Sequence, residues 1–557
     1  MQFSNIYTLF RSQCAKYGDS PIFYTRNRSS WSGQSWNEVE DKVLDFACAL
    51  LAKGLTKGGS VAILAGNVPE WTICDIGAIS AGGVGVGIYP TSSRDQSEFI
   101  LHHSGAEYLL VDSSAQFEKI SDIGGPLPNL KEIICINRPE DDSTEIVESQ
   151  SGWSVVTKEV PVTHLKEFLE YGRNNREHCL PLVEEAGRNA NSSDIAIIVY
   201  TSGTTGQPKG AMLSHKYILN SVESLRRSVP IFDTDTSLSY LPGCHVAERI
   251  SGIYNRLYNG ATAYFVNDLG KLYEYMLDVK PTVFASLPRF FEKIHARVIS
   301  ENGAENVRTQ TLKDAFGGNV RLLTSGGAPL PLEIADFFSK RDLPILQAYG
   351  LTENICVAFN TVEDHKFGTV GKPMPMCEIR IAADGEVLVK SEMMFSGYYK
   401  EPEKTAEMFD ADGWLKTGDL GELDADGFLK ITGRKKEIIV LSNGKNVAPA
   451  LIENYVKESH LISHCFLYGD GRSYCVALIT INLNEAALMC REQIGGLVGQ
   501  IVKKANARVS SSEQIKKFVV LEGDFSTERD EITPTMKLKR NVVAQNHKAI
   551  LENLYEQ

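Results

Sequence analysis

A segment dense in glycine and hydroxyl side chains, Tyr200–Gly210 (YTSGTTGQPKG), is the clearest candidate for chemistry in the sequence. Glycines let backbone N–H groups turn toward a phosphate, the hydroxyls add donors, and Lys209 adds positive charge. The spacing from Gly203 lacks the Gly-Lys-Ser/Thr ending of a Walker loop, which excludes a P-loop NTPase. An apolar run at 195–200 predicts a strand before the segment, and the residues from about Met212 predict a helix after it. We therefore expect a phosphate-binding loop at a strand end.

Two further segments carry side chains that could hold the rest of a nucleotide. In Gln347–Glu353 (QAYGLTE), the ring of Tyr349 could stack on a purine and Thr352 could bind a phosphate. The Glu353 carboxylate is the hard oxygen ligand that Mg²⁺ prefers. The small residues of 325–329 (SGGAP) would let backbone approach a base closely. Taken alone, Tyr349 could equally be an ordinary core aromatic.

Four other polar side chains have weaker local signals. Asp419, after Thr-Gly, could accept two hydrogen bonds from a ribose, although an isolated TGD more often forms a turn. His245 follows Leu-Pro-Gly-Cys, and a single histidine is more often structural than functional. Arg434 and Lys537 lie in basic runs, where a solvated charge is the ordinary interpretation.

The elements that must position these groups alternate between strand-like and helix-like patterns over the first ~430 residues. Short apolar runs between helices indicate strands that are covered on both faces of parallel sheets. In such sheets ligands gather at the strand ends. The predicted strands are 61–64, 84–88, 108–111, 195–200, 283–286, 320–324 and 345–348, and the predicted helices include 70–81 and 94–104.

The pattern of strand-like and helix-like segments changes beyond Trp414. A turn signal at 424–427 precedes a short predicted strand at 428–431, and the polar, Gly-led run 433–437 follows. We therefore predict an α/β protein with a large N-terminal body of covered, parallel-type sheets and a small α+β C-terminal domain joined by a hinge. The predicted domains are 1–432 and 433–557.

Composition and charge narrow the function classes. The 557 residues are 43% hydrophobic and 23% charged, which is a globular composition. The net charge of −13 argues against a nucleic-acid-binding surface. No run is apolar enough to span a bilayer, and the N-terminus lacks the pattern of a signal peptide. Eleven cysteines without a CxxC pair predict reduced thiols in the cytoplasm and argue against a zinc site.

With these motifs in order along the chain, the sequence resembles the adenylate-forming superfamily, which includes acyl-CoA synthetases, peptide-synthetase adenylation domains and firefly luciferase. The resemblance covers nearly the whole chain. Tyr200–Gly210 resembles the family's phosphate loop, Gln347–Glu353 its adenine and magnesium motif, Thr417–Leu420 its ribose motif, Gly433–Lys436 its hinge and, more loosely, Pro534–Lys537 its C-terminal lysine loop.

The resemblance implies roles for individual residues. It implies Mg²⁺ binding at Glu353 and Thr201, and it implies that His245 lines the junction of an acyl tunnel and a thiol tunnel. The implied catalytic residues are Lys209, His245, Glu353 and Lys537. The implied nucleotide contacts are Thr201, Ser202, Gly203, Thr204, Thr205, Gly206, Lys209, Gly326, Gly327, Ala328, Tyr349, Gly350, Thr352, Asp419, Arg434 and Lys436.

One departure from the family pattern leaves the lysine assignment open. The family usually has glycine immediately before the C-terminal lysine, whereas Met536 stands there in this chain. Lys539 is therefore an alternative to Lys537.

The family's chemistry has two half-reactions. A carboxylate attacks the α-phosphorus of Mg-ATP to give an acyl-adenylate and pyrophosphate, and coenzyme A then displaces AMP. Because the substrate carboxylate is already ionised, no nucleophilic side chain is needed. The resemblance therefore implies fatty acid, ATP and coenzyme A as substrates.

The segments 241–249, 412–420 and 445–454 resemble the long-chain fatty-acyl branch of the family. The sequence departs from this branch at one place. Thr432-Gly433 precedes Arg434, whereas many eukaryotic long-chain enzymes carry Asp there. Medium-chain acids, aryl acids, loading of a carrier protein and a non-catalytic binding role stay open as alternatives. Since long acyl chains partition into bilayers, peripheral contact with a membrane also stays open, although no segment demonstrates it. No pattern indicates an oligomeric state.

Overall fold

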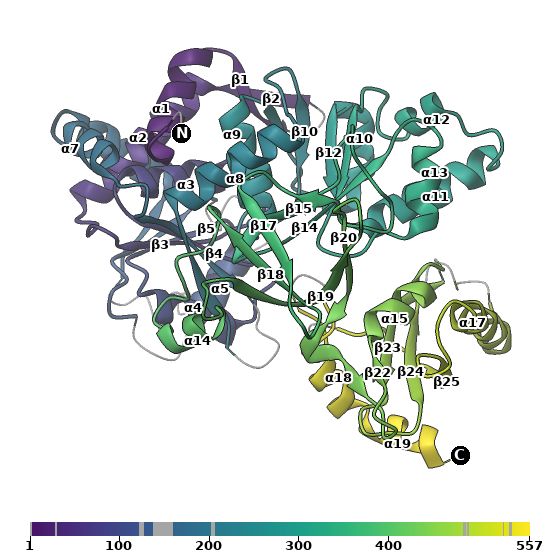
Figure 1. Ribbon diagram of the computed structural model, residues 1–557. Coiled ribbons are helices and arrows are strands. Elements are labelled where there is room, and N and C mark those ends of the chain that lie inside the picture. The colour runs from purple at the N-terminus through teal and green to yellow at the C-terminus, as the bar shows by residue number, and fades with distance from the viewer. Residues whose placement is uncertain are drawn as a thin grey trace.

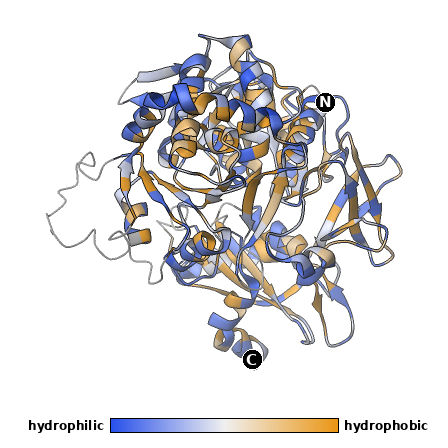
Figure 2. Cartoon of the chain, turned by 90° about the vertical axis from the view of Figure 1, so that its left-hand side faces the viewer, coloured by the Kyte–Doolittle hydropathy of each residue, from blue (hydrophilic) through white to orange (hydrophobic). Residues whose placement is uncertain are grey.

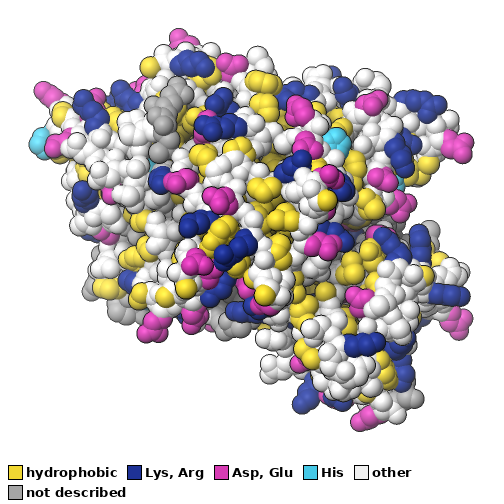
Figure 3. Space-filling view, viewed as in Figure 1, with side chains coloured by type: hydrophobic (Ala, Val, Ile, Leu, Met, Phe, Trp, Pro, Cys, Tyr) yellow, Lys and Arg dark blue, Asp and Glu magenta, His cyan; other side chains and the backbone are white. Residues whose placement is uncertain are grey.

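A computed structural model of the chain describes residues 3–27, 30–121, 127–137, 160–201, 207–459, 461–482, 486, 489–526, 528–533 and 537–556. Of the predicted site residues, Ser202, Gly203, Thr204, Thr205 and Gly206 lie outside this part of the chain. The described residues form a large body that contains the N-terminus and a small one that contains the C-terminus (Figure 1). The small body is a separate lobe in the space-filling view (Figure 3).

A seven-stranded sheet is the largest layer of the large body. Its inner strands β3, β4, β5 and β6 are buried at every residue, because helices cover the sheet as the apolar runs predicted. All neighbouring strands are parallel except the last pair, β8 and β9. In spatial order the strands are β7 (Val162–His164), β6 (Glu132–Cys135), β5 (Tyr108–Val111), β3 (Ser60–Leu64), β4 (Val84–Ile88), β8 (Ile195–Thr201) and β9 (Lys209–Ser214).

Three further sheets complete the large body. One is mixed, with β12 (Val283–Ser286), β13 (Leu322–Ser325) and β14 (Ile345–Leu351) parallel and β15 (Asn354–Phe359) and β16 (Lys372–Pro373) antiparallel. The second contains β10 (Thr236–Ser239), β11 (Thr262–Phe265), β1 (Pro21–Asn27) and β2 (Ser30–Ser35). The third is antiparallel and contains β17 (Cys377–Ile381), β18 (Glu386–Ser391), β19 (Leu415–Leu423) and β20 (Leu429–Arg434).

The helices of the large body pack against these sheets. They are α1 (Ile6–Tyr17), α2 (Trp36–Ala52), α3 (Pro69–Ser80), α4 (Arg94–Ser104), α5 (Ser114–Ser121), α6 (Leu165–Asn174), α7 (Arg176–Asn189), α8 (His215–Ser228), α9 (Asn255–Asn259), α10 (Leu272–Val279), α11 (Pro288–Asn302), α12 (Thr309–Asp314), α13 (Leu332–Ser339) and α14 (Pro402–Glu407), with a π-helix η2 (Ala247–Tyr254) and a 3₁₀ turn η3 (Leu269–Lys271). The central strands are hydrophobic, whereas the outer helices show much hydrophilic surface (Figure 2).

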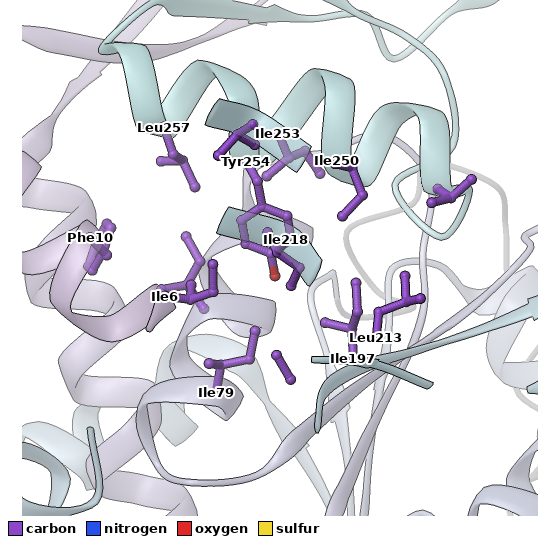
Figure 4. Close-up of a cluster of buried hydrophobic side chains, with 14 of the residues drawn as sticks. Ile6, Phe10, Ile79, Ile197, Leu213, Ile218, Ile250, Ile253, Tyr254 and Leu257 are labelled. Carbon is purple, nitrogen blue, oxygen red and sulfur yellow. The ribbon is translucent and has the colours of Figure 1, made fainter. Parts of the chain in front are cut away.

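Helix and sheet meet in an apolar core. Side chains from α1, α3, β8, β9, α8, η2 and α9 point toward one another there, with Ile79, Ile197 and Ile218 among those labelled in Figure 4. Each of these three isoleucines is at most 2% exposed. This core holds β8 and β9, which carry the two ends of the predicted phosphate loop.

The small body has its own sheet and its own apolar clusters. Its elements are a 3₁₀ turn η4 (Lys435–Glu437), β21 (Ile439–Val440), β22 (Asn446–Val447), α15 (Pro449–Lys457), β23 (Ile462–Tyr468), β24 (Cys475–Ile481), α17 (Arg491–Asn506), β25 (Ile515–Val520), α18 (Arg540–Asn546) and α19 (Lys548–Glu556). Among the described residues, the apolar clusters of the large body reach no further than Ile431, and those of the small body begin at Ile439.

The α/β fold with a large and a small body is as predicted. The boundary between 432 and 433 stays a prediction, and β20 continues two residues past it, through Gly433 and Arg434. All eleven cysteines carry free thiols, ten of them buried and Cys490 exposed. Within the described residues, none of the helices combines the length and apolarity that crossing a bilayer requires.

The helix predicted from about Met212 forms as α8, but it begins three residues later than predicted. Residues 209–214 form β9, antiparallel to β8, and α8 begins only at His215, where the Ser214 side chain accepts a hydrogen bond from Tyr217 N at 3.1 Å. The reason is non-local: the backbone groups of β9 pair with β8, a partner that helical periodicity cannot reveal. The predicted phosphate loop therefore joins two antiparallel strands.

Candidate active site

Lys209 and Glu353 meet at the ring of Tyr398. Lys209 begins β9, opposite Thr201 at the end of β8, so the two residues flank the predicted phosphate loop. The Lys209 ammonium lies 4.9 Å from the centre of the Tyr398 ring, and the Tyr398 hydroxyl donates a short hydrogen bond to Glu353 Oε1. Burial and the Glu353 charge raise the pKa of Tyr398 well above its usual range. The tyrosine therefore stays protonated and donates.

Backbone pairing places Tyr398 there. Met212 N donates to Gly397 O at 3.0 Å and Tyr399 N donates to Gly210 O at 2.8 Å, so segment 396–399 lies along the free edge of β9. This edge pairing joins residues nearly two hundred positions apart in the sequence.

Glu353 lies in the tight turn between β14 and β15. Thr352 and Glu353 connect the paired residues on either side, and Phe395 N donates to Glu353 O at 2.8 Å. Tyr217, buried on α8, donates from its hydroxyl to Thr352 O at 2.9 Å and accepts from Ile355 N at 3.0 Å. The turn is therefore fixed from two sides, and the Glu353 side chain is only 9% exposed.

Tyr349, Asp419 and Arg434 form a second cluster. Strand pairing sets Asp419 on β19 opposite Arg434 on β20, and Arg434 Nε lies 2.9 Å from Asp419 Oδ1. The Tyr349 hydroxyl donates to Asp419 Oδ2 at 2.6 Å, and burial together with the Asp419 charge raises the pKa of Tyr349. The strand β14 runs to Leu351, past the predicted end at 348, so Tyr349 and Gly350 lie within the strand.

The small residues after β13 form an open strand end. Gly326 is partly buried, whereas Gly327 and Ala328 are exposed. Gly327 has φ +76°, a conformation that side chains other than glycine rarely adopt, and an added Cβ would lie 3.3 Å from Leu287 Cδ2. The backbone here remains accessible, as close approach of a flat base would require.

His245 precedes the π-helix η2. Its Nδ1 accepts from Ala247 N at 3.2 Å, which leaves the proton of the neutral ring on Nε2. Burial and, to a smaller extent, the positive charge of Lys537 together lower the pKa of His245 to about 4. The histidine is therefore neutral near pH 7. The ring of Tyr89 lies edge-on at 6.4 Å between centroids.

Lys537 comes from the small body, yet its charge acts on groups of the large body. The pKa of Lys537 is lowered, first by the protein that surrounds the ammonium and then by repulsion from Arg434; Asp419 and Glu437 oppose this effect. The side chain keeps contact with solvent. The structure thus gathers Lys537, Arg434, Asp419 and His245 in one electrostatic neighbourhood.

Lys539 has a different environment. Its ammonium forms a short ion pair with Asp530 on the surface of the small body. Lys436 is exposed on η4, and its neighbour Lys435 forms the ion pairs at this turn, with Asp384 at 2.5 Å and Glu386 at 2.8 Å.

The sequence interpretation missed Tyr398 and Tyr217. The Gly-Tyr-Tyr sequence at 397–399 is the only local signal for Tyr398, and Tyr217 has none, because both act through partners distant in the sequence. The roles of the other residues, including Ser202–Gly206, stay predictions.

The residues near Lys209 fit a magnesium ion that arrives with a phosphate substrate. Mg²⁺ in such sites takes one or two carboxylates and completes its shell with phosphates and water. Glu353 supplies one buried carboxylate beside Lys209, and Thr201 supplies a hydroxyl. Within the described ranges there is no group of three or more His, Cys, Asp or Glu that could form a cage made only of protein.

Comparisons with known proteins identify the family of the chain. Residues 10–399 match the family described as AMP-binding enzyme, and residues 436–557 match the AMP-binding enzyme C-terminal domain. The chain is 33% identical to the long-chain-fatty-acid–CoA ligase FadD15 of Mycobacterium bovis, over 94% of this chain and 92% of that protein. It is 30% identical to the long-chain-fatty-acid–CoA ligase ACSBG2 of Homo sapiens, over 98% and 91%.

Solved structures share the fold. The A domain of a carboxylic acid reductase from Segniliparus rugosus, in complex with AMP and a co-purified carboxylic acid, superposes with a TM-score of 0.85 at 23% identity, covering 100% of this chain and 95% of that one. An anthranilate CoA ligase, AuaEII, superposes with a TM-score of 0.79 at 20% identity, covering 99% and 98%. Because the family match covers most of its length, the chain belongs to the AMP-binding enzymes, which form the adenylate-forming superfamily.

Proposed function

We propose that the chain is an AMP-forming ligase that activates a long-chain fatty acid with ATP and transfers the acyl group to coenzyme A. Relatives named long-chain-fatty-acid–CoA ligase support this proposal. FadD15, for example, is 33% identical to this chain over most of both proteins. The observation that carries the proposal is that Lys537 of the small body lies within electrostatic range of Asp419 and Arg434 of the large one.

Asp419 and Tyr349 would hold the nucleoside. Asp419 has one carboxylate oxygen toward Arg434 and the other toward Tyr349, which fixes its orientation for ribose hydroxyls. The open backbone at Gly326–Ala328 and the ring of Tyr349 would flank the adenine.

The phosphates would lie between the two ends of the predicted loop. Lys209 and Thr201 face that space from paired strands, and Ser202–Gly206 would supply backbone donors. Glu353 and Thr201 would hold the magnesium that accompanies ATP, and this ion offsets phosphate charge when bound. Tyr398, which contacts both Lys209 and Glu353, would keep the two side chains at a fixed separation.

Lys537 would act in the first half-reaction. As the fatty carboxylate attacks the α-phosphorus, negative charge grows on the phosphate oxygens and the departing pyrophosphate. A preorganised cation at that place lowers the barrier. Because the substrate carboxylate is itself the nucleophile, the protein needs only to position it and to neutralise charge.

The second half-reaction would need Lys537 to leave. The thiol of coenzyme A would attack the carbonyl carbon of the acyl-adenylate and displace AMP, and it would need room beside this group, where Lys537 would stand in the first step. The small body would rotate about the turn that holds Lys436, while Lys435 stays anchored to Asp384 and Glu386. Neutral His245 would then border the acyl carbon as an uncharged polar group.

Product analysis tests the reaction class and the acid. With Mg-ATP and coenzyme A, acids of increasing chain length and aryl acids are compared for AMP, pyrophosphate and thioester. We expect AMP and pyrophosphate in equal amounts and the highest kcat/KM with long-chain acids. ADP as the product would overturn the adenylation chemistry, and a preference for aryl acids would overturn the choice of substrate.

Half-reaction assays test Lys537. Lys537→Ala should slow acyl-adenylate formation roughly a hundredfold or more, the scale of losing a preorganised charge contact. It should still convert supplied acyl-adenylate and coenzyme A to thioester. Lys539→Ala is the matched control, and we expect it to keep the first step. A large loss with Lys539→Ala and none with Lys537→Ala would reverse the assignment.

A further inference from the structure

A fully buried carboxylate stands at the base of the loop that carries Lys537. Glu531 has 0% of its surface exposed. Its side chain accepts from Arg529 Nε at 2.8 Å, from Ser526 N at 3.3 Å and from Asn546 Nδ2 at 3.3 Å, and it lies 2.9 Å from His547 Nε2. Burial alone would raise its pKa, but the hydrogen bonds outweigh burial and hold the pKa below its usual range. The group is therefore a buried anion.

A buried anion is costly unless its partners compensate it closely. Here the partners come from both sides of the loop. Arg529 precedes the loop, whereas Asn546 ends α18 and His547 follows it. Glu531 therefore ties the start of the loop to the helical end of the small body, where Val543 and Leu551 are buried in an apolar cluster.

Backbone hydrogen bonds join the two ends of the loop next to Glu531. Lys539 N donates to Glu531 O at 2.8 Å, and Ile532 and Leu538 form an antiparallel bridge. The backbone of residue 531 thus fixes the distance between the two ends of the loop.

The closure continues up to Lys537. Thr533 N donates to Lys537 O at 2.8 Å, and Lys537 N donates to Thr533 Oγ1 at 3.1 Å. The backbone of Lys537 is therefore fixed relative to Glu531, and its ammonium lies within electrostatic range of Asp419 and Arg434 of the other body.

We propose that Glu531 is a positioning residue for adenylation: through Arg529, Asn546 and His547 it holds the loop so that Lys537 reaches the reacting phosphate. This inference rests on the proposed role of Lys537. Its physical basis is that small displacements of a catalytic charge cost rate steeply, whereas the thioester step does not use this charge.

The decisive variant is Glu531→Gln, which keeps the shape and removes the charge. We expect the kcat of acyl-adenylate formation to fall about 10- to 100-fold, the scale of a misplacement of about 1 Å, with the KM for ATP nearly unchanged. Thioester formation from supplied acyl-adenylate and coenzyme A should stay within about twofold of the parent, since positioning of Lys537 does not enter that step.

Asp524→Asn is the matched control. Asp524 also pairs with a histidine of the small body, His464, at 2.8 Å, but its side chain binds Thr480 and not the Lys537 loop. We expect this variant to leave the kcat of adenylation unchanged. Equal loss in both half-reactions for Glu531→Gln, or an adenylation loss in Asp524→Asn as large as that in Glu531→Gln, would overturn the positioning role.

Two further variants keep the test decisive. If Glu531→Gln fails to fold, Asn546→Ala removes one partner near the surface and should lower the adenylation kcat about threefold, with thioester formation intact; an unchanged kcat would overturn the inference. Lys537→Ala separates the two proposals. If it slows adenylation while Glu531→Gln does not, the positioning role alone fails. If Lys537→Ala itself has no effect, the proposed function of Lys537 fails.

Discussion

The large body contains two clusters built from the same three side-chain types, an aspartate, an arginine and a tyrosine. In one, Asp75 pairs with Arg249 and accepts from the Tyr254 hydroxyl at 2.7 Å, and both charged side chains are 0% exposed. In the other, Asp419 pairs with Arg434 and accepts from Tyr349 at 2.6 Å, but the Arg434 side chain is 50% exposed. We call them the sealed triad and the open triad.

The sealed triad depends on an unusual helix. Arg249 and Tyr254 are five residues apart on η2, and the i→i+5 geometry of a π-helix directs residues at that spacing to one side. Both therefore reach Asp75 on α3. The neighbouring strand leaves room only for glycine, since a Cβ on Gly85 would lie 2.1 Å from Asp75 Oδ1.

The open triad is assembled by strands instead. Asp419 and Arg434 face each other across β19 and β20, and Tyr349 arrives from β14. Solvent contacts the Arg434 side of the open triad, and the charge of Lys537 acts on it. The comparison teaches that side-chain identity does not separate a sealed network from an open one. What separates them is whether any polar group keeps access to a ligand.

The largest expected effect is on the sealed triad. Arg249→Met leaves the buried Asp75 charge without its partner, and we expect a loss of about 3–5 kcal/mol in the free energy of unfolding. Chemical denaturation measures it. Arg434→Met is the matched change in the open triad and should cost less than about 1 kcal/mol, because water replaces the partner. Similar losses for both would show that exposure does not distinguish the triads.

The second-largest expected effect is on ATP use, and it concerns the open triad and not the sealed one. Asp419→Asn should lower kcat/KM for ATP about 10- to 100-fold, since hydrogen bonds to a charged group contribute about 1.5–3 kcal/mol. Pyrophosphate exchange at varied ATP measures it. In Asp75→Asn, any folded fraction should retain the parental KM for ATP. A changed KM in that variant would mean that the sealed triad also contacts nucleotide.

Removing the tyrosine hydroxyls gives a smaller contrast. Tyr254→Phe should destabilise the fold by about 1–2 kcal/mol, because one oxygen of Asp75 loses a buried donor. Tyr349→Phe should change stability by less than half of that and mainly raise the KM for ATP. Thermal unfolding and ATP kinetics on the same preparations check both statements, and equal stability losses would contradict the proposed difference.

Salt should produce the smallest effect. Raising the ionic strength from about 0.05 M to about 0.5 M shortens the screening length and should shrink the effect of Arg434→Met on stability by a few tenths of a kcal/mol. The loss in Arg249→Met should stay constant, because salt does not reach a sealed pair. A salt-dependent loss in Arg249→Met would indicate that water and ions enter the sealed triad.

Where information is local, the sequence alone determined the structure. The helix predicted at 94–104 forms within those bounds, because Ser93 caps it through Gln96 and Gly105 ends it at φ +63°. The strands at 84–88, 108–111 and 283–286 also have the predicted bounds, since a short, mainly apolar run between turn residues marks a strand. The order of the polar motifs along the chain was likewise sufficient to identify the family.

Pairing between distant segments was decided only by the tertiary structure. The helix predicted from about Met212 begins only at His215, because residues 209–214 form β9, whose two edges pair with β8 and with segment 396–399. The same edge brings Tyr398 to Lys209, although nothing near Tyr398 in the sequence marks such a partner.

The two triads show the limit most clearly. Asp75 and Arg249 are 174 positions apart, and Tyr349 and Asp419 are 70 apart. Neither grouping has a local signature, because a side chain's hydrogen bonds and its exposure depend on which elements pack around it. The sequence supplied the chemistry of each residue and its local element, whereas packing decided which aspartate belongs to the sealed triad and which one to the open triad.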